Sequence, residues 1–177
     1  MDTLDRYIKI ALSDKQVLKL VHGKANIVLY PELIYYDNID QILGRYGACF
    51  LLFESKPNYG HWTCLIRRGN TIEFFDPYSG YPDDNLKFVP EEFKHKSNQD
   101  KPYLSMLLLN SPYKLEYNEF DFQNKKQGVN TCGRWCAMRI LFKYLTIEEF
   151  ASLFLNKNGD KMVTYLTMWV NITNTRK

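Results

Sequence analysis

Residues 127–142 read QGVNTCGRWCAMRILF, and this stretch predicts a buried helix that begins near a cysteine. From Trp135 onward it is rich in apolar residues and contains neither Pro nor Gly, which is typical of a core helix. Asn130 and Thr131 are residue types that favour the N-cap position. Cys132 would then lie in the first turn, where unpaired backbone N–H groups and the helix dipole favour a thiolate over a thiol. The stretch therefore makes Cys132 a candidate nucleophile.

Gly133 follows the cysteine directly and removes a side chain next to the sulfur. Because glycine has no Cβ, the backbone of a bound substrate could approach closely at this point. The alternative for Cys132 is structural, since a free cysteine often serves as a small apolar residue in a core. For an isolated Cys-Gly pair the structural interpretation is the commoner one, so the choice depends on the rest of the chain.

Length and composition predict one domain spanning residues 1–177. The chain is 45% hydrophobic and 24% charged, which is ordinary for a soluble globular protein. Its apolar runs are too short to cross a membrane, and the acidic, amphipathic N-terminus does not resemble a signal peptide. We therefore expect neither secretion nor a membrane partner. Four cysteines are expected to be free thiols in a reducing compartment: Cys49, Cys64, Cys132 and Cys136.

The charge balance gives only weak support for nucleic-acid binding. The chain has 23 basic and 20 acidic residues, a net charge of +3, and the basic cluster at 94–101 lies next to acidic residues that dilute it. We expect a monomer. The 13 Tyr and 11 Phe exceed what a small core needs, so some are expected to line a peptide-binding groove.

The remaining pattern predicts an α+β domain in which helices flank an antiparallel sheet. Segments 48–55, 61–68 and 71–78 are β-rich and separated by short turns, as in an antiparallel meander. Thr146 and Glu149 match a capping box at the start of a helix. The other expected elements are a helix over 3–12, a helix capped by Ser13, a strand over 26–31, a helix within 36–47 capped by Asp37 or Asn38, helical pieces at 90–96 and 103–109, a strand over 114–122, and a last helix capped by Asp160 and running through Trp169.

His61 stands at the head of one predicted strand, and Asp76 ends the next. A hairpin between these strands would bring the two side chains together as a base and its orienting carboxylate. A cysteine nucleophile needs an imidazole that protonates the leaving amine, and the imidazole needs an acceptor that fixes its tautomer. His61 alone would more often be structural, and His22 and His95 have no comparable setting.

Three short motifs carry a resemblance to a known family: GHW at 60–62, FFDPYSG at 74–80 and TCGRWC at 131–136. In this order they resemble the adenovirus-type (adenain-like) maturation proteases and the related SUMO-specific (Ulp-type) proteases. The similarity spans about residues 48–145 and is greatest to the proteases of virophages, large DNA viruses and Polinton-type elements. It implies a permuted papain-like cysteine protease fold with the nucleophile at a helix N-terminus.

The resemblance implies a triad of Cys132 as nucleophile, His61 as general base and acid, and Asp76 as orienting acid, a position at which the adenovirus enzyme has Glu. It also implies an oxyanion glutamine, for which the chain offers Gln123 and Gln127, nine and five residues before the nucleophile (132 − 123 and 132 − 127). Neither spacing matches that of the family. We favour Gln123, because a longer loop can bulge and this residue ends a predicted strand, and keep Gln127 as the alternative. The Cys132 backbone N–H would be the second donor.

Trp62 and Gly133 are the expected substrate-binding residues. Trp62 would pack beside the imidazole, although a core aromatic is equally consistent with the sequence. A narrow cleft leading to the cysteine would admit Gly-Gly or Gly-Ala backbones and block larger side chains.

The function implied by the resemblance is a cysteine endopeptidase that cleaves viral capsid precursor proteins after small, Gly-rich motifs during virion maturation. The alternative is a ubiquitin-like-protein (SUMO-type) deconjugating protease, for whose folded substrate a chain of 177 residues leaves little surface. No cofactor is expected, and activation by a peptide or DNA, as in the adenovirus relative, stays open. The expected partners are protein substrates, and the expected location is the virion and the host cytoplasm or virus factory.

Two non-protease interpretations compete. A zinc site could use Cys132, Cys136, His61 and Cys64, which are suitable ligand types. The two helical cysteines are, however, one turn apart, as on any buried helix face, so no metal is expected. A binding module with an inactive site is the other alternative, and the presence of all three triad residues argues against it.

Overall fold

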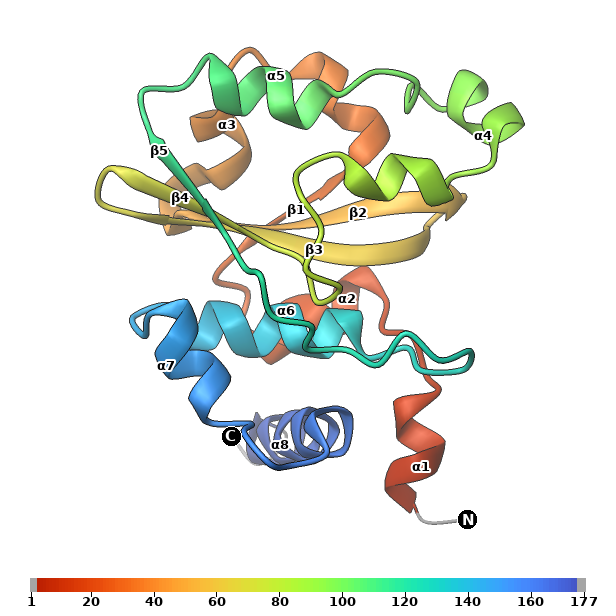
Figure 1. Ribbon diagram of the computed structural model, residues 1–177, viewed down its shortest axis with the longest axis vertical. Coiled ribbons are helices and arrows are strands. Elements are labelled where there is room, and N and C mark those ends of the chain that lie inside the picture. The colour runs from red at the N-terminus through yellow and green to blue at the C-terminus, as the bar shows by residue number, and fades with distance from the viewer. Residues whose placement is uncertain (1–2, 175–177) are drawn as a thin grey trace.

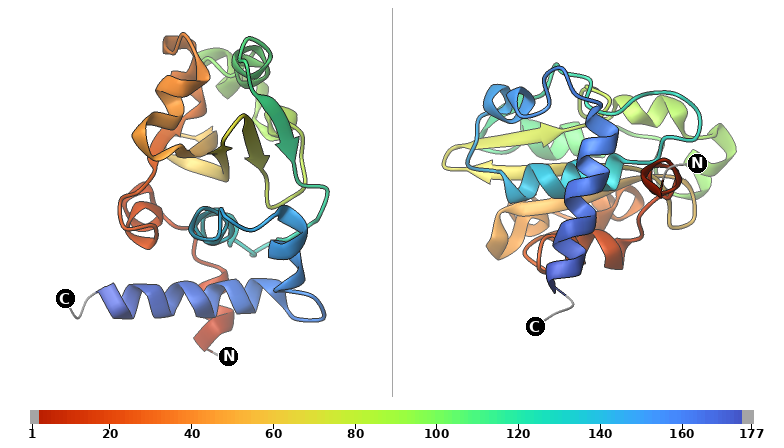
Figure 2. Two further views of the ribbon diagram at one scale, coloured as in Figure 1. Left: turned by 90° about the vertical axis from the view of Figure 1, so that its left-hand side faces the viewer. Right: turned by 90° about the horizontal axis from the view of Figure 1, so that it is seen from below.

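The computed structural model describes residues 3–174, with side chains described as far as Met168. A five-stranded sheet lies between two groups of helices, one on each face (Figure 1 and Figure 2). This arrangement confirms the predicted α+β class with helices flanking a sheet.

The strands of the sheet lie side by side in chain order: β1 (Asn26–Leu29), β2 (Ala48–Lys56), β3 (Tyr59–Arg68), β4 (Thr71–Phe75) and β5 (Lys114–Tyr117). The three central strands form the predicted antiparallel meander. The edge strands differ from the prediction, since β1 pairs with β2, and β5 with β4, in parallel. Two neighbouring strands that run parallel must be joined by a long crossover connection. The helical segments between β1 and β2 and between β4 and β5 form these connections.

The helices divide between the two faces (Figure 1). One face carries η1 (Tyr30–Tyr35), α3 (Ile39–Leu43), η2 (Gly44–Tyr46), η3 (Asp84–Phe88), α4 (Glu91–Lys96) and α5 (Tyr103–Leu109), where η denotes a 3-10 helix. The other face carries α2 (Asp14–Leu20) and α6 (Cys132–Leu141), with α1 (Thr3–Ile8), α7 (Ile147–Ser152) and α8 (Gly159–Asn174) around them.

Side chains of the central strands alternate between two cores. Phe50 and Leu52 of β2 pack into the core on the α6 side. Cys49, Leu51 and Phe53 pack into the core on the opposite face. Successive residues of a strand point to opposite faces of the sheet. Because β2 is buried on both faces, its sequence contains the continuous apolar run ACFLLF.

Several helix starts form as their cap residues predict. Ser13 and Thr146 each complete a capping box, and Asn38 accepts a hydrogen bond from the backbone N–H of Gln41. These oxygens satisfy N–H groups that have no partner within the helix.

Several boundaries differ from the prediction. The helix expected over 3–12 ends at Ile8, and the strand expected over 114–122 ends at Tyr117. The last helix begins one residue before Asp160, so Asp160 lies inside its first turn and does not cap it. In the described part of the chain, none of the helices is both long and apolar enough to cross a membrane.

Candidate active site

The β3–β4 hairpin brings His61 and Asp76 into contact. His61 lies in β3 opposite Phe53 of β2, and Asp76 follows β4 directly. Nε2 of His61 and Oδ1 of Asp76 are 2.7 Å apart. The Asp76 side chain is 1% exposed and the His61 side chain 16% exposed, so the carboxylate is shielded while the imidazole borders solvent. The predicted pairing of the two side chains is confirmed.

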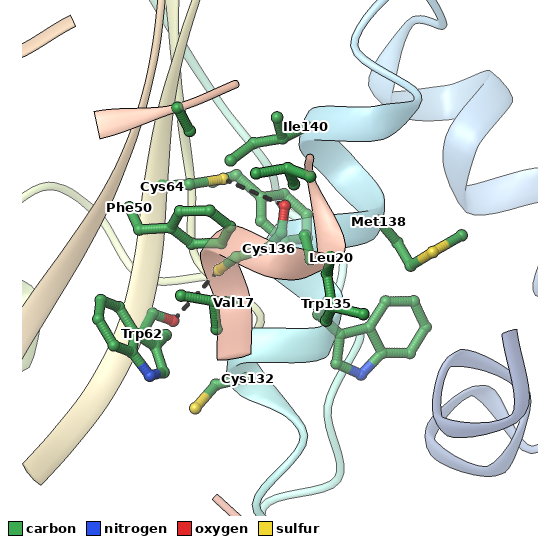
Figure 3. Close-up of a cluster of buried hydrophobic side chains, with 14 of the residues drawn as sticks. Val17, Leu20, Phe50, Trp62, Cys64, Cys132, Trp135, Cys136, Met138 and Ile140 are labelled. Atoms are coloured by element: carbon green, nitrogen blue, oxygen red, sulfur yellow. Dashed lines mark hydrogen bonds between the residues drawn. The ribbon is translucent and has the colours of Figure 1, made fainter. Parts of the chain in front are cut away.

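Cys132 is the first residue of α6, which packs against β3. It lies close enough to the imidazole of His61 to raise the pKa of that ring. Because Asp76 occupies Nε2, Nδ1 is the ring nitrogen left for the thiol. Figure 3 shows the sulfur of Cys132 at the start of the helix, pointing away from Cys64 and Cys136 in the core. The three side chains predicted as a triad are therefore adjacent.

The surroundings of His61 favour its charged form. Burial opposes the charge and is the largest single influence, but hydrogen bonds and negative charge from Asp76 and Cys132 outweigh it and raise the pKa of His61 to about 10. For Asp76, burial would raise the pKa, yet the imidazole and other donors hold the pKa below its ordinary value. The site thus favours an imidazolium beside the sulfur, which can donate a proton.

Two asparagines hold Asp76 in place. Nδ2 of Asn85 donates to Oδ2 of Asp76 over 2.7 Å. Oδ1 of Asn118 accepts from the backbone N–H of Asp76 at 2.9 Å, and its Nδ2 donates to the carbonyl at 2.7 Å. Neither residue is singled out by the sequence, because Asn85 stands in a polar segment and Asn118 within a predicted strand, and no local pattern indicates that either side chain contacts Asp76.

Two glycines permit the close approaches that this geometry needs. A Cβ at Gly60 would overlap the carbonyl oxygen of Phe53, so only glycine fits in the strand pair just before His61. A Cβ at Gly80 would lie 2.5 Å from Oδ2 of Asp76. Two of the motifs that carry the family resemblance therefore contain glycine for a steric reason.

Tyr78 and Gln123 complete the surroundings of the imidazole. The Tyr78 ring stacks on His61, with 4.4 Å between centroids and 5° between planes. Nε2 of the buried Gln123 donates to the Tyr78 hydroxyl at 3.2 Å and to the carbonyl of Val129 at 2.9 Å. Gln127 is exposed in a turn. The structure therefore brings Gln123 and not Gln127 to the site. The role of Gln123 at an oxyanion stays a prediction.

Gly133 faces the core, so the prediction that it admits a substrate backbone is wrong. A Cβ at Gly133 would lie 2.9 Å from Val17 and 3.1 Å from Trp62, and the glycine instead lets α2 and β3 pack closely on α6. Trp62 is 4% exposed, and its Nε1 donates to the carbonyl of Leu12. Trp62 also borders a cavity of about 460 Å³, so contact with substrate stays a prediction for this residue.

Thr131 precedes α6 but does not cap it through its side chain, contrary to the prediction. Its hydroxyl donates to Oδ1 of Asp160 at 2.6 Å, and Nε1 of Trp135 donates to the same oxygen at 3.0 Å. Asn130, the other predicted cap, donates through its side chain to the carbonyl of Lys9. The loop before α6 is therefore held by distant segments and not by a local cap.

The zinc alternative finds no support in the described part of the structure. All four cysteines are free thiols, as predicted. Sγ of Cys136 contacts the carbonyl of Trp62 at 3.4 Å, and Sγ of Cys64 contacts the carbonyl of Cys136 at 3.9 Å (Figure 3). Among the residues described, no group of three or more His, Cys, Asp and Glu side chains could hold a metal ion.

A cavity of about 530 Å³ opens beside His61 and Asp76. Much of its wall is apolar and aromatic, formed by Phe53, Tyr59, Tyr78, Phe88 and Val89. Aromatic residues thus line a hollow next to the site, and peptide binding in it stays a prediction.

Comparisons with known proteins give one close relative. No protein-family model matches the chain. The chain is 50% identical over 175 residues to "Uncharacterized protein V9" of Sputnik virophage, a match that covers 95% of this chain and 100% of that protein.

Two solved protease structures are similar in overall shape. The ASFV pS273R protease has a TM-score of 0.48 at 15% identity, covering 92% of this chain and 68% of that one. The SUMO protease Ulp1, with its catalytic cysteine oxidized to a sulfinic acid, has a TM-score of 0.41 at 14% identity, covering 94% and 80%. Both similarities concern overall shape at low sequence identity.

Proposed function

The chain belongs to the same family as the Sputnik virophage protein V9, and from the geometry of its site we propose that it is a cysteine protease. One observation carries the proposal. Nε2 of His61 lies 2.7 Å from the Asp76 carboxylate, and Cys132 lies close enough to the same imidazole to raise its pKa. A thiol, an imidazole and a buried carboxylate in series form the unit with which cysteine proteases attack a peptide carbonyl.

The proposed reaction has two halves. The Cys132 thiolate attacks the carbonyl carbon of the scissile bond, and the protonated His61 gives its proton to the leaving amine, which leaves a thioester. His61, now neutral, takes a proton from a water molecule that attacks the thioester and releases the thiolate. Asp76 stays ionised and holds the imidazole through Nε2, so that Nδ1 faces the sulfur.

The proposed substrates are viral capsid precursor proteins, cut after small, Gly-rich motifs as by the adenovirus-type maturation proteases. Cys132 is only 6% exposed, so a small residue before the scissile bond helps its carbonyl to reach the sulfur. The cavity beside His61 has room for an apolar side chain of the substrate. The virophage relative favours a viral substrate, processed in the virion or in the host cytoplasm or virus factory.

Cleavage of capsid precursors is the test. Purified protein is incubated with virophage capsid proteins, with and without added DNA, and the cut ends are identified by mass spectrometry. We expect cuts after Gly-Gly or Gly-Ala with the wild type and none with Cys132→Ala or His61→Ala. Both variants should keep the circular dichroism spectrum of the wild type. Cleavage at an undiminished rate by either variant would contradict the triad.

Deconjugation of a SUMO-type modifier is the competing function. A SUMO precursor with its C-terminal tail intact serves as the second substrate in the same assay. Removal of the tail after Gly-Gly, with capsid precursors left whole, would favour deconjugation over capsid processing.

A further inference from the structure

Tyr78 contacts three of the groups that the proposed site contains. Its ring lies face to face with the His61 imidazole, 4.4 Å between centroids. Its backbone N–H donates to Oδ1 of Asp76 at 2.8 Å. Its hydroxyl accepts a hydrogen bond from Nε2 of Gln123 at 3.2 Å. Tyr78 thus connects the imidazole and its carboxylate to the glutamine predicted for the oxyanion.

Both amide hydrogens of Gln123 are engaged. The carbonyl of Val129 can only accept, so the bond of 2.9 Å to it identifies the amide nitrogen and fixes the orientation of the side chain. The second hydrogen points to the Tyr78 hydroxyl. Oε1 of Gln123 is buried without a partner among the described residues. In this arrangement Gln123 has no free N–H for an oxyanion.

The Tyr78 hydroxyl does have a free proton. A tyrosine hydroxyl donates one hydrogen bond in addition to those it accepts. Among the described residues, its hydrogen bond is the one from Gln123, in which it is the acceptor. Burial, followed by the negative charges of Cys132 and Asp76, raises the pKa of Tyr78 to about 12. The hydroxyl therefore keeps its proton at the pH values at which a protease works.

We propose that the Tyr78 hydroxyl is the side-chain donor to the oxyanion, and that Gln123 positions this hydroxyl and does not itself donate to the oxyanion. The inference rests on the proposed protease function. When the thiolate attacks, the C–S bond forms and the carbonyl π electrons move to oxygen. That oxyanion accepts hydrogen bonds from Tyr78 and from the backbone N–H of Cys132. The carbonyl then re-forms as the amine leaves with a proton from His61.

A double-mutant cycle of Tyr78→Phe and Gln123→Ala tests this assignment, with a fluorogenic peptide ending in Gly-Gly as substrate. Tyr78→Phe keeps the stacked ring and removes only the hydroxyl, so kcat should fall roughly a hundredfold with little change in KM. Gln123→Ala should lower kcat about tenfold by loosening the hydroxyl. In the Tyr78→Phe background Gln123→Ala should cause no further loss, because Gln123 acts through Tyr78. Gln127→Ala is the matched control and should keep the wild-type rate.

Alkylation of Cys132 by iodoacetamide forms no oxyanion, so it separates an oxyanion role from damage to the His61–Asp76 pair. The alkylation rate should be the same in Tyr78→Phe and the wild type. A fall in both alkylation and hydrolysis would overturn the assignment in favour of a role through His61. A wild-type rate for Tyr78→Phe, together with a roughly hundredfold loss for Gln123→Ala, would make Gln123 the direct donor. A wild type that cuts neither the peptide nor a capsid precursor overturns the proposed function, and this assignment with it.

Discussion

At the scale of single residues, the protonation state of His61 determines what the proposed site can do. Burial disfavours its charge, but Asp76 and Cys132 more than offset burial and raise its pKa to about 10. A raised pKa means that protonation of His61 stabilises the fold fully below its ordinary pKa of 6.5, and that this contribution is lost as the pH rises through about 10. The pKa of Asp76 is lowered from 3.8, so its contribution is present above that value and is lost as the pH falls through the lowered pKa. Between these limits the ion pair is intact.

The first prediction concerns the pH dependence of hydrolysis. We expect kcat/KM to stay level from neutral pH upward and to fall as the pH rises through about 10, because His61 then lacks the proton that the leaving amine takes. The measurement is the rate on a fluorogenic peptide across neutral and alkaline pH.

Asp76→Asn is the control for this profile. It removes the negative partner of the imidazolium, so the fall should move to lower pH, and the rate should drop less than in His61→Ala because the imidazole is still present. A fall at the same pH in Asp76→Asn and the wild type would mean that Asp76 does not set the charge of His61.

The second prediction concerns the relative reactivity of the four cysteines. Cys49, Cys64 and Cys136 are 0% exposed, and burial raises the pKa of Cys49 and Cys136. Cys132 lies at a helix N-terminus beside an imidazolium. Native protein treated with iodoacetamide should therefore be modified first at Cys132, as read by peptide mass spectrometry. Equal labelling of all four thiols would show that Cys132 is not activated.

At the scale of elements, α6 is fixed at both ends. Near the start of α6, Gly133 lets α2 and β3 pack closely against the helix. Near its end, the buried Arg139 pairs with Glu73 of β4 at 2.7 Å and donates to the carbonyls of Phe142 and Leu145. These contacts position the whole helix on the sheet, and through it the sulfur of Cys132.

The third prediction tests this packing. Gly133→Ala should lower the free energy of unfolding by roughly 1–3 kcal/mol, because the added Cβ meets Val17 and Trp62 in a filled core. Urea unfolding followed by tryptophan fluorescence measures the change. Adding Val17→Ala to Gly133→Ala should restore part of the loss, since it removes the nearest atom. Full stability of Gly133→Ala would mean that α6 can shift without cost.

At the scale of the whole molecule, α8 returns to the start of α6. Asp160 in its first turn is buried and accepts three hydrogen bonds, from the hydroxyl of Thr131, from Nε1 of Trp135 and from the backbone N–H of Asn124 at 2.9 Å. One carboxylate therefore fixes both ends of the loop that runs from Gln123 to the nucleophile.

The fourth prediction is that Asp160→Ala loosens this loop. Three donors lose their acceptor, and two of them, those of Thr131 and Trp135, belong to buried residues. Each buried unsatisfied donor costs about 1–3 kcal/mol, so the free energy of unfolding should fall by about 2 kcal/mol or more. Hydrolysis should fall as well, because Gln123 and Cys132 lose their common support. Urea unfolding measures the stability, and a peptide assay measures the hydrolysis. The matched control is Glu148→Ala, which removes an exposed acidic residue from the first turn of α7 and should change neither the free energy of unfolding nor the rate of hydrolysis.

The amino-acid sequence by itself determines what depends on neighbours along the chain. The meander, the caps at Ser13 and Thr146, and the position of Cys132 in the first turn of a buried helix all follow from periodicity and turn chemistry. The pairing of His61 with Asp76 is also predictable, because a short hairpin fixes which residues of its two strands come together.

Only the tertiary structure decides what depends on how distant elements face each other. The parallel edge strands depend on how the helical crossovers return to the sheet. The choice of Gln123 over Gln127, and the inward direction of Gly133, depend on which side of the loop and of α6 faces the core. Asn118 reaches Asp76 from 42 residues away. Local patterns set the conformation of a segment but not the orientation in which it packs, and for these residues the orientation determines the role.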